Sequence, residues 1–375
     1  MFGICPGQPD RRKGVIAQLV ERVVRNDEVR GSTPLGSSLS LQLPPSPEAL
    51  PSHSMEILIV SPSASVPNGN SNTAEHWASE LSDLGHTVRI AGENDQKPAD
   101  LLIALHAEKS HQALTDFKGR QLSPIVVVLT GTDLYPSLSS TSLKSLEMAD
   151  RIVVYQAKAR TRLPPGLRDR TRVIHLSPPD HPALQSRGGR TDHFTVCVVG
   201  HLRAVKDPMR TARAARLLPA TSRHRVLHAG AILEDQFTPE VEREQRENPR
   251  YRWLGNLAEE EACQLIASSD LLSLTSSHEG GGWVLNEAAA ARTPIVATRN
   301  DATTSLLGDD YPGLFPFGDT EGLSILLQRC ESDPSFHDLL LESARRHLEE
   351  YRTTREKENW SSLLTELFPP PMSGS

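Results

Sequence analysis

The chain has 375 residues, of which 37% are hydrophobic and 28 are proline, and its formal net charge is −7. This length allows two domains of ordinary size, and the negative charge argues against a protein that binds nucleic acids or membrane surfaces. No apolar run of the sequence approaches the ~18 residues that a membrane-spanning helix needs. The four cysteines are scattered, which argues against a zinc module or a disulfide framework and favours a reducing compartment. We therefore expect a cytoplasmic protein with no nucleic-acid or membrane partner.

Residues 1–54 differ in composition from the rest of the chain. They contain seven prolines and seven serines and have no sustained apolar period. Directly after Met55, the apolar run Glu56–Val60 is typical of the first strand of an α/β domain. We expect 1–54 to be a disordered leader or the product of a misplaced start codon, and a regulatory extension is the alternative.

From Met55 onward, apolar segments alternate with amphipathic ones, as in parallel strands joined by crossover helices. In the first half, a helix is predicted over Thr73–Leu84, and Gly85 ends it. Near-continuous apolar runs indicate strands that are covered on both faces. First-half strands are predicted at Ile57–Val60, Thr87–Ala91, Leu101–Leu105, Pro124–Leu129, Arg151–Tyr155 and Arg172–Leu176.

A second round of strands follows the segment Ser177–Thr191, whose prolines and glycines indicate a linker. Two helices are predicted between Pro334 and Phe368. Second-half strands are predicted at Phe194–Val199, Arg225–Ala229, Arg250–Leu254, Asp270–Leu274 and Pro294–Ala297.

The expected fold class is α/β, with two doubly wound Rossmann-like domains that face each other across a cleft, where such folds bind ligands. The expected boundaries are a leader at 1–54, a first domain at 55–180, a linker at 181–193, a second domain at 194–350, a C-terminal helix at 351–368 and a tail at 369–375.

The loop after the strand Phe194–Val199 carries two cations. Gly200 ends the strand, Arg203 and Lys206 follow three residues apart, and Pro208 can open a helix. Such a loop can direct a forked guanidinium and an ammonium at one diphosphate. A solvated basic loop is the alternative.

A later loop carries three glycines, Gly280, Gly281 and Gly282, between a strand and a helix. Glycines there let the backbone approach an anion and direct free N–H groups toward it. Glu279 precedes the glycines and Glu287 lies about one turn inside the helix, so both carboxylates can hold sugar hydroxyls near one helix end. The alternative is a flexible loop and a glutamate that the helix dipole favours.

Two further features of the second half are less specific. His228 lies at a strand end, where a lone histidine is more often structural. The aromatic residues of Tyr251–Gly255 can line a nucleobase slot or belong to the core, and both interpretations stay open.

In the first half, the loop after the first strand contains Gly69 and Asn70 and ends at Thr73, which can cap the next helix. These residues can hold a small anion across the cleft, although turn formation also explains them. His106 and Asp133 each follow a strand and face the cleft if the sheet is parallel. Either can serve as a base or as a hydroxyl anchor, and a structural role is the alternative.

These motifs resemble those of GT-B glycosyltransferases of the retaining family 4 group, in which seven residues separate two glutamates. In that family the basic pair binds the diphosphate of the sugar nucleotide, the earlier glutamate binds the donor sugar and the later one binds the ribose. The resemblance gives these roles to Arg203, Lys206, Glu279 and Glu287. It also implies GT-B architecture, with C-terminal helices that pack back toward the first domain.

Residues 55–368 as a whole resemble the selenosugar synthases of selenoneine biosynthesis. The matching segments are Leu105–Ala107, Leu129–Tyr135, Gly200–Pro208, Asn248–Gly255 and Asp310–Asp319. This resemblance implies transfer of the sugar of UDP-N-acetylglucosamine or UDP-glucose to the selenium of selenophosphate, with release of UDP and phosphate. It makes selenophosphate synthetase and selenoneine synthase the pathway neighbours. Because no metal-ligand cluster is visible in the sequence, we expect no metal or other cofactor.

The chain departs from this family at four positions. The family has arginines where this chain has Ser71 and His76, and its Glu-Gly-Gly-Ala-Asn run becomes Glu-Gly-Gly-Gly-Trp here, ending at Trp283. An anionic acceptor favours cations, and a tryptophan can alter the sugar pocket. Two alternatives therefore stay open: a family 4 transferase with an ordinary hydroxyl acceptor, and a catalytically silent protein that binds sugar nucleotides.

Overall fold

The computed structural model describes residues 54–62, 69–92, 95–179, 181–185, 192–348 and 353–369. The expectations for the leader at 1–53 and for the tail beyond residue 369 lie outside these residues. In the described residues, no helix is both long enough and apolar enough to cross a membrane.

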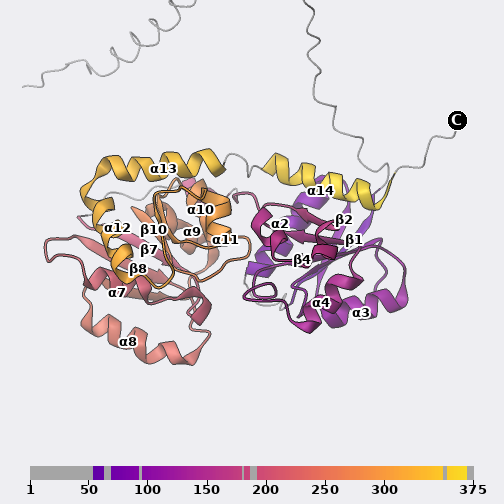
Figure 1. Cartoon of the computed structure of the whole chain (residues 1–375), viewed down its shortest axis with the longest axis horizontal. Coiled ribbons are helices and arrows are strands. Elements are labelled where there is room, and N and C mark those ends of the chain that lie inside the picture. Colours follow the sequence, from indigo (N-terminus) through magenta and orange to yellow (C-terminus); the bar gives the residue numbers. More distant parts are fainter. Residues whose placement is uncertain are drawn as a thin grey trace, which may run out of the picture. The chain divides into compact units, whose positions relative to one another are not determined.

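The first sheet has six parallel strands in the order β2-β1-β3-β4-β5-β6 (Figure 1). They are β1 (Glu56–Val60), β2 (Thr87–Ala91), β3 (Leu101–Leu105), β4 (Ile125–Leu129), β5 (Arg151–Val154) and β6 (Thr171–Val173). Every residue of β3 and β4 is buried, as expected for strands that are covered on both faces. The strand order reverses between β1 and β3, so the loops after these two strands flank the ligand-binding edge of the sheet.

Helices cover both faces of the first sheet. Its first-domain helices are α2 (Gly69–Asp83), α3 (His111–Arg120), α4 (Ser140–Met148), α5 (Ala157–Thr161) and α6 (Pro165–Arg168). Alternate residues of β1 face opposite sides: Ile57 and Ile59 pack with Trp77 of α2, whereas Leu58 and Val60 pack with Phe117 of α3.

The second sheet also has six parallel strands, in the order β12-β11-β10-β7-β8-β9. They are β7 (Phe194–Val199), β8 (His224–Ala229), β9 (Tyr251–Gly255), β10 (Leu271–Leu274), β11 (Ile295–Thr298) and β12 (Leu314–Phe315). The order reverses between the neighbouring strands β7 and β10. This is the strand order of the doubly wound dinucleotide-binding fold, whose ligand crevice lies beyond the carboxyl ends at this reversal.

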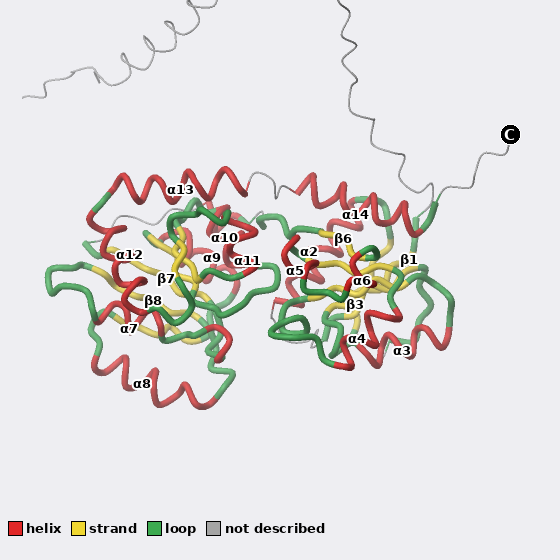
Figure 2. Tube along the Cα trace, in the orientation of Figure 1, coloured by secondary structure: helices red, strands yellow, loops and turns green. Residues whose placement is uncertain are grey.

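Helices and short 3-10 turns precede, connect and follow the strands of the second sheet (Figure 2). The helices are α7 (Arg210–Arg216), α8 (Thr238–Glu247), α9 (Glu259–Ser268), α10 (Trp283–Ala290), α11 (Asp301–Leu307), α12 (Thr320–Ser332) and α13 (Pro334–Leu348). The 3-10 turns are η1 (Pro182–Gln185), η2 (Ala204–Lys206) and η3 (Asp235–Phe237).

The last helix, α14 (Thr353–Leu367), packs on the first domain, against α2 (Figure 1). Trp360 of α14 meets Trp77 of α2 edge to face, with ring centroids 4.8 Å apart. The expected return of the C-terminal helices to the first domain is therefore confirmed for α14. The preceding helix α13 packs instead on α10, α11 and α12 of the second domain.

The start of the first helix was predicted wrongly. The first helix begins at Gly69 rather than Thr73, because Ser71, Thr73 and Trp77 share its buried face. The predicted linker 181–193 contains η1, whose Leu184 is 1% exposed and belongs to the core of the second domain. Burial of an apolar side chain fixes this part of the segment despite its prolines.

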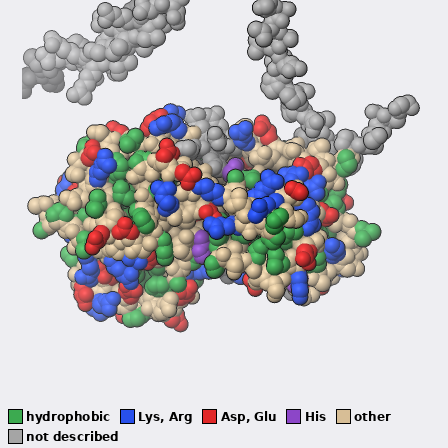
Figure 3. Space-filling model, in the orientation of Figure 1, with side chains coloured by type: hydrophobic (Ala, Val, Ile, Leu, Met, Phe, Trp, Pro, Cys, Tyr) green, Lys and Arg blue, Asp and Glu red, His purple; other side chains and the backbone are tan. Residues whose placement is uncertain are grey.

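Figure 3 shows where charges gather on one face of the described residues. Basic side chains cluster over the first domain, whereas both signs are mixed over the second. Part of the positive charge of the first domain is neutralised by the last helix, since Arg151 and Arg172 both pair with Glu366 of α14.

Candidate functional site

The reversal of strand order in the second sheet brings two predicted loops together. Gly200 follows β7, and Thr275 follows β10, its neighbour in the sheet. The hydroxyl of Thr275 donates to the carbonyl oxygens of Lys206 (2.9 Å) and Asp207 (3.0 Å). The N–H of Ser277 donates to the carbonyl of Val205 at 2.9 Å. The basic loop is therefore held against the start of the glycine loop.

Lys206 and Glu279 form an ion pair across these two loops. The Lys206 Nζ lies 2.7 and 2.9 Å from the two carboxylate oxygens of Glu279. The Lys206 side chain is 29% exposed and that of Glu279 is 10% exposed. The structure thus brings a predicted diphosphate ligand and a predicted sugar ligand into direct contact.

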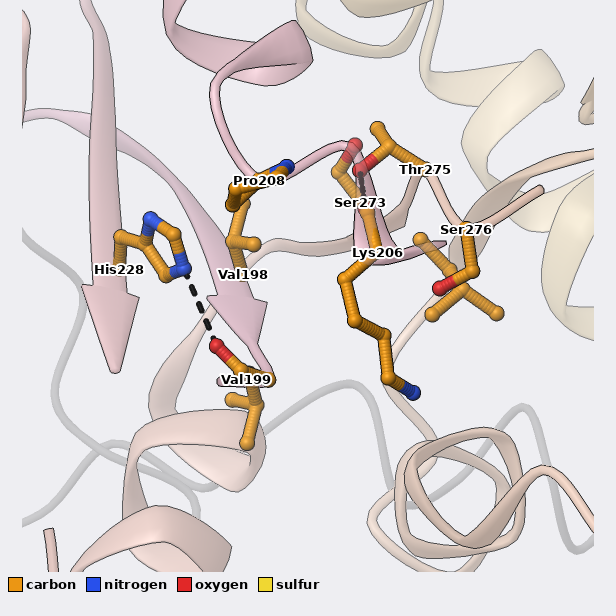
Figure 4. A pocket seen from close by; sticks show the side chains of 10 residues that line it. Val198, Val199, Lys206, Pro208, His228, Ser273, Thr275 and Ser276 are labelled. Atoms are coloured by element: carbon orange, nitrogen blue, oxygen red, sulfur yellow. Dashed lines mark hydrogen bonds between the residues drawn. The ribbon is translucent and has the colours of Figure 1, made fainter. Parts of the chain in front are cut away.

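A small pocket lies between the ends of β7, β8 and β10 (Figure 4). Its lining includes Gly200, Lys206, His228 and Ser276. Ser276 is 1% exposed, and its hydroxyl has no hydrogen-bond partner among the described residues. A buried hydroxyl without a partner is costly, so this group is available to a polar ligand in the pocket. Sequence reasoning missed Ser276, because nothing in the sequence separates it from Ser277.

His228 lines the pocket and is held in place by two hydrogen bonds. Its Nε2 donates to the Gly200 carbonyl (3.2 Å), and its Nδ1 accepts from the Tyr251 hydroxyl (3.0 Å). Burial lowers the pKa of His228 to about 4, so the ring is neutral at pH 7. Gly230 also fits here for a steric reason, since a Cβ at this position would overlap the Gly200 carbonyl. The role of His228 is therefore structural.

The aromatic residues of β9 belong to the core and its border rather than to an open slot. Tyr251 is 4% exposed. Trp253 packs against the core of the second domain and donates its indole N–H to the Gly230 carbonyl at 2.9 Å. The interpretation of these residues as a nucleobase slot is not supported by their contacts.

Arg203 is half-buried on the same loop as Lys206. Its guanidinium makes no hydrogen bond or ion pair with any residue that the structure describes. Burial lowers the pKa of the nearby His201, and the charges of Lys206 and Arg203 lower it further. The positive charges of this loop therefore disfavour protonation of His201, as expected near a binding site for an anion.

The three glycines have a steric role that the sequence did not reveal. A Cβ at Gly280 would overlap the Thr130 carbonyl, and one at Gly281 would overlap the Leu176 side chain. Thr130 and Leu176 belong to the first domain. Gly282 has a φ of 65°, in the left-handed region that favours glycine. The glycines therefore let the loop contact the first domain directly. Among the described residues, no backbone carbonyl accepts a hydrogen bond from the N–H groups of these glycines.

Glu287 lies on α10, after the glycine loop, and is half-buried. Burial, with a smaller effect of Glu259, raises its pKa to about 7. Its carboxylate makes no hydrogen bond or ion pair within the described part of the chain. A carboxylate held in this way gains stability when a ligand hydroxyl donates to it.

Of the two candidate bases in the first domain, Asp133 has a structural role. Its side chain is buried and accepts from the N–H groups of Ala107 (2.8 Å), Thr130 (2.9 Å) and Gly131 (2.9 Å). Burial raises the pKa of Asp133, and these hydrogen bonds oppose the rise. The carboxylate shapes the loop after β4 and is not free to abstract a proton from a substrate.

His106 follows β3 at the ligand-binding edge of the first sheet. It is 4% exposed and has a φ of 71°, which is uncommon for a residue other than glycine. Its Nδ1 accepts from the Lys109 N–H (3.3 Å), so Nε2 donates to the Thr132 hydroxyl (3.1 Å). Burial lowers the pKa of His106, which keeps the ring neutral. His106 is therefore buried and hydrogen-bonded within the first domain.

The residues predicted to hold an acceptor anion lie in the first helical turns of α2 rather than in a loop. Gly69 and Asn70 are its first residues. Thr73 does not cap the helix; its hydroxyl donates to the Gly69 carbonyl at 2.8 Å. The same oxygen accepts the indole N–H of Trp283 at 2.9 Å. Trp283 is thus directed toward the first domain, and it is not among the residues that line the pocket beside Lys206.

The described residues contain no group of three or more His, Cys, Asp or Glu side chains placed to hold a metal ion.

Comparison with known proteins places this geometry in a class. Residues 183–351 match the family model of glycosyl transferases group 1. No curated protein matches the sequence significantly. The two Rossmann-like parallel sheets have the arrangement of the GT-B fold, and the family match covers less than half of the chain.

Several solved structures share this fold. HepE from Anabaena, in complex with UDP and glucose, has a TM-score of 0.64 at 18% identity, covering 83% of this chain and 100% of that one. A glycosyltransferase from Rickettsia africae has a TM-score of 0.69 at 14% identity, and sucrose-phosphate synthase from Thermosynechococcus elongatus has 0.65 at 16%. Each of these two matches covers 84% of this chain and 99% of the other.

Proposed function

We propose that this chain is a glycosyltransferase that moves the sugar of UDP-glucose or UDP-N-acetylglucosamine onto the selenium of selenophosphate. The observation that carries the proposal is the pairing of Lys206 with Glu279 at the strand-order reversal of a group 1 glycosyltransferase domain. HepE, which has the same fold, has been solved with UDP-glucose. That fold-level likeness supports a UDP-sugar as the donor.

The polar side chains of the two loops and of α10 each have a task in this proposal. Arg203 and Lys206 bind the diphosphate, and the Ser276 hydroxyl adds a neutral donor. Glu279 holds hydroxyls of the donor sugar, and Glu287 accepts from the ribose. Because charge develops on the leaving diphosphate, the fixed ammonium of Lys206 stabilises the transition state more than the ground state.

The proposed reaction has two steps. The selenium lone pair forms the C1–Se bond while the bond from C1 to the diphosphate oxygen breaks, and the electron pair leaves with UDP. Water then cleaves the P–Se bond, which gives phosphate and the selenosugar. Selenium is a strong nucleophile, so no strong general base is needed, and this agrees with the structural roles of Asp133 and His106.

Selenophosphate as the acceptor is supported by the sequence. The segments Leu129–Tyr135 and Gly200–Pro208 resemble those of selenosugar synthases over long, specific stretches. In the structure, the first segment forms the loop after β4, whose Thr130 meets Gly280. Gly280 of the glycine loop thus meets the first segment, and Ser277 at the start of that loop bonds to Val205 of the second segment.

A hydroxyl acceptor is a second candidate, favoured by one observation. The helix α2 contains no lysine or arginine in its 15 residues. Its only histidine, His76, is engaged by the buried carboxylate of Glu356 at 2.9 Å. The acceptor side therefore offers little positive charge to an anion.

The rate of UDP release separates these candidates. UDP-glucose or UDP-N-acetylglucosamine is mixed anaerobically with the full chain and with selenophosphate, inorganic phosphate, glycerol or glucose. Release that depends on selenophosphate supports the proposal, and release only with the alcohols supports the second candidate. Tight UDP binding without release in any mixture would show a silent binder.

A further inference from the structure

Trp283 connects the two domains through its side chain. It is the first residue of α10 in the second domain and directly follows Gly282. Its indole N–H donates to the Thr73 hydroxyl of α2 at 2.9 Å. Its ring meets that of His76 edge to face, with centroids 5.3 Å apart and an interplanar angle of 89°. The indole thus lies on the first-domain side of the loop that carries Glu279.

Thr73 and His76, the two residues of α2 that contact Trp283, are themselves held by hydrogen bonds. The Thr73 hydroxyl donates to the Gly69 carbonyl, so its oxygen is left to accept from the indole. His76 Nε2 bonds to Glu356 of α14 at 2.9 Å, and Glu356 also accepts from the Trp77 indole and the Ser177 N–H. The Glu356 side chain is 1% exposed. A rigid backing of this kind holds the indole in one place.

The rest of the loop is closed against the first domain as well. Gly280 meets the Thr130 carbonyl and Gly281 meets Leu176, each too closely for a Cβ. The Asn286 amide donates to the Leu176 carbonyl at 3.0 Å. Between Gly280 and Asn286, Trp283 is the bulky side chain that reaches α2.

We propose that Trp283 determines the size of the acceptor, and that the acceptor is a compact group of the dimensions of a tetrahedral oxyanion. The inference rests on the proposed function, because it takes the Glu279 loop to face the reacting carbon. The indole occupies volume that a hexose ring would need beside α2. Because a hydrogen bond and a fixed histidine hold the indole, moving it aside costs more than rotating a free side chain.

The test compares acceptors of graded size in three proteins: the wild type, Trp283→Ala and Trp283→Phe. UDP release gives kcat/KM with selenophosphate, glycerol and glucose, and calorimetry gives the Kd for UDP. Trp283→Ala is expected to raise the ratio of kcat/KM for glucose to that for selenophosphate by about tenfold or more. Trp283→Phe keeps most of the bulk but loses the N–H, so its ratio stays within about threefold of the wild type.

An unchanged ratio in Trp283→Ala, with UDP binding retained, overturns the inference and leaves the proposed function standing. Failure of the wild type to bind UDP overturns the proposed function instead. If Trp283→Ala does not fold, Trp283→Leu replaces it and the same ratio decides. Thr73→Val separates volume from hydrogen bonding, because it removes the acceptor of the indole N–H at nearly constant volume. Size control by the indole predicts that the ratio rises far less in Thr73→Val than in Trp283→Ala.

Discussion

The ammonium of Lys206 lies within 2.9 Å of both carboxylate oxygens of Glu279, although the two residues are 73 positions apart in the chain. The pair joins the loop after β7 to the loop after β10 at the point where the strand order reverses. Each charge holds the other in position, so a ligand phosphate that binds Lys206 shares an ammonium that is already oriented. Orientation of this kind lowers the reorganisation needed during transfer.

Replacement of Lys206 tests this arrangement. Lys206→Met should lower kcat for UDP release by about 100-fold, because the leaving diphosphate loses a fixed positive charge. The melting temperature should change little, since the pair is partly exposed. Lys357→Met is the matched control, because Lys357 pairs with Asp83 on α2, outside the pocket. Equal rates in the two variants would remove Lys206 from the mechanism.

The raised pKa of Glu287 predicts how nucleoside binding depends on pH. Ribose hydroxyls donate to the ionised carboxylate, so binding favours the deprotonated form and strengthens as the pH rises through about 7. Uridine is the suitable probe, because it has a ribose but no titrating phosphate. Its Kd should be about tenfold weaker at about pH 6 than at about pH 8. In Glu287→Gln this dependence should vanish, and an equal slope in both proteins would contradict the assignment.

Glu356 should contribute strongly to stability. Burial alone would raise its pKa, but hydrogen bonds from His76, Ser177 and Trp77 hold the pKa below the ordinary value. Removal of one member of a buried charged cluster costs about 3 kcal/mol, so Glu356→Ala should lose that much free energy of unfolding at about pH 7. Since the folded pKa is depressed, the contribution is present above the ordinary value of 4.5 and is lost as the pH falls through the folded pKa.

Urea unfolding of Glu356→Ala and Glu366→Ala provides the measurement. Glu366 lies on the same helix, but its ion pairs with Arg151 and Arg172 are partly exposed and should contribute about 1 kcal/mol or less. If the two variants lost similar amounts of free energy of unfolding at neutral pH, the buried cluster would stabilise the protein no more than the partly exposed ion pairs do.

Gly280 should be intolerant of even one methyl group. A Cβ there overlaps the Thr130 carbonyl, so Gly280→Ala must separate the glycine loop from the first domain. We expect kcat for UDP release to fall by about tenfold or more, with a smaller effect on the Kd for UDP. Gly119→Ala in α3 is the control, because a Cβ at Gly119 meets no atom within 4 Å. A fully active Gly280→Ala would show that the contact with Thr130 is dispensable.

Most strands could be predicted from the sequence because both sheets are covered on both faces. The apolar runs at Leu101–Leu105 and Phe194–Val199 match β3 and β7 residue for residue. The strand β12 was missed, since its two residues, Leu314 and Phe315, are too few to give a pattern. The start of α2 was misplaced because Gly69 and Asn70 have the composition of a turn, and tertiary burial of the following residues overrides that preference.

The candidate site was predictable where it depends on the loops after β7 and β10, since the strand order brings these loops together. The partners of its side chains were not. His76 and Glu356 are 280 residues apart, and Trp283 and Thr73 are 210 apart, so no local pattern pairs them. A catalytic and a structural role both stayed open for Asp133, because sequence alone does not show that backbone N–H groups occupy its carboxylate.

The most direct test of the central claim is to identify the product. The full chain is incubated anaerobically with UDP-N-acetylglucosamine or UDP-glucose and fresh selenophosphate, and the mixture is examined by mass spectrometry. We predict a compound of the sugar that has the isotope pattern of one selenium atom, formed in equal amount to UDP and formed about 100-fold more slowly with Lys206→Met. Release of UDP without any selenium-containing sugar from either donor would contradict it.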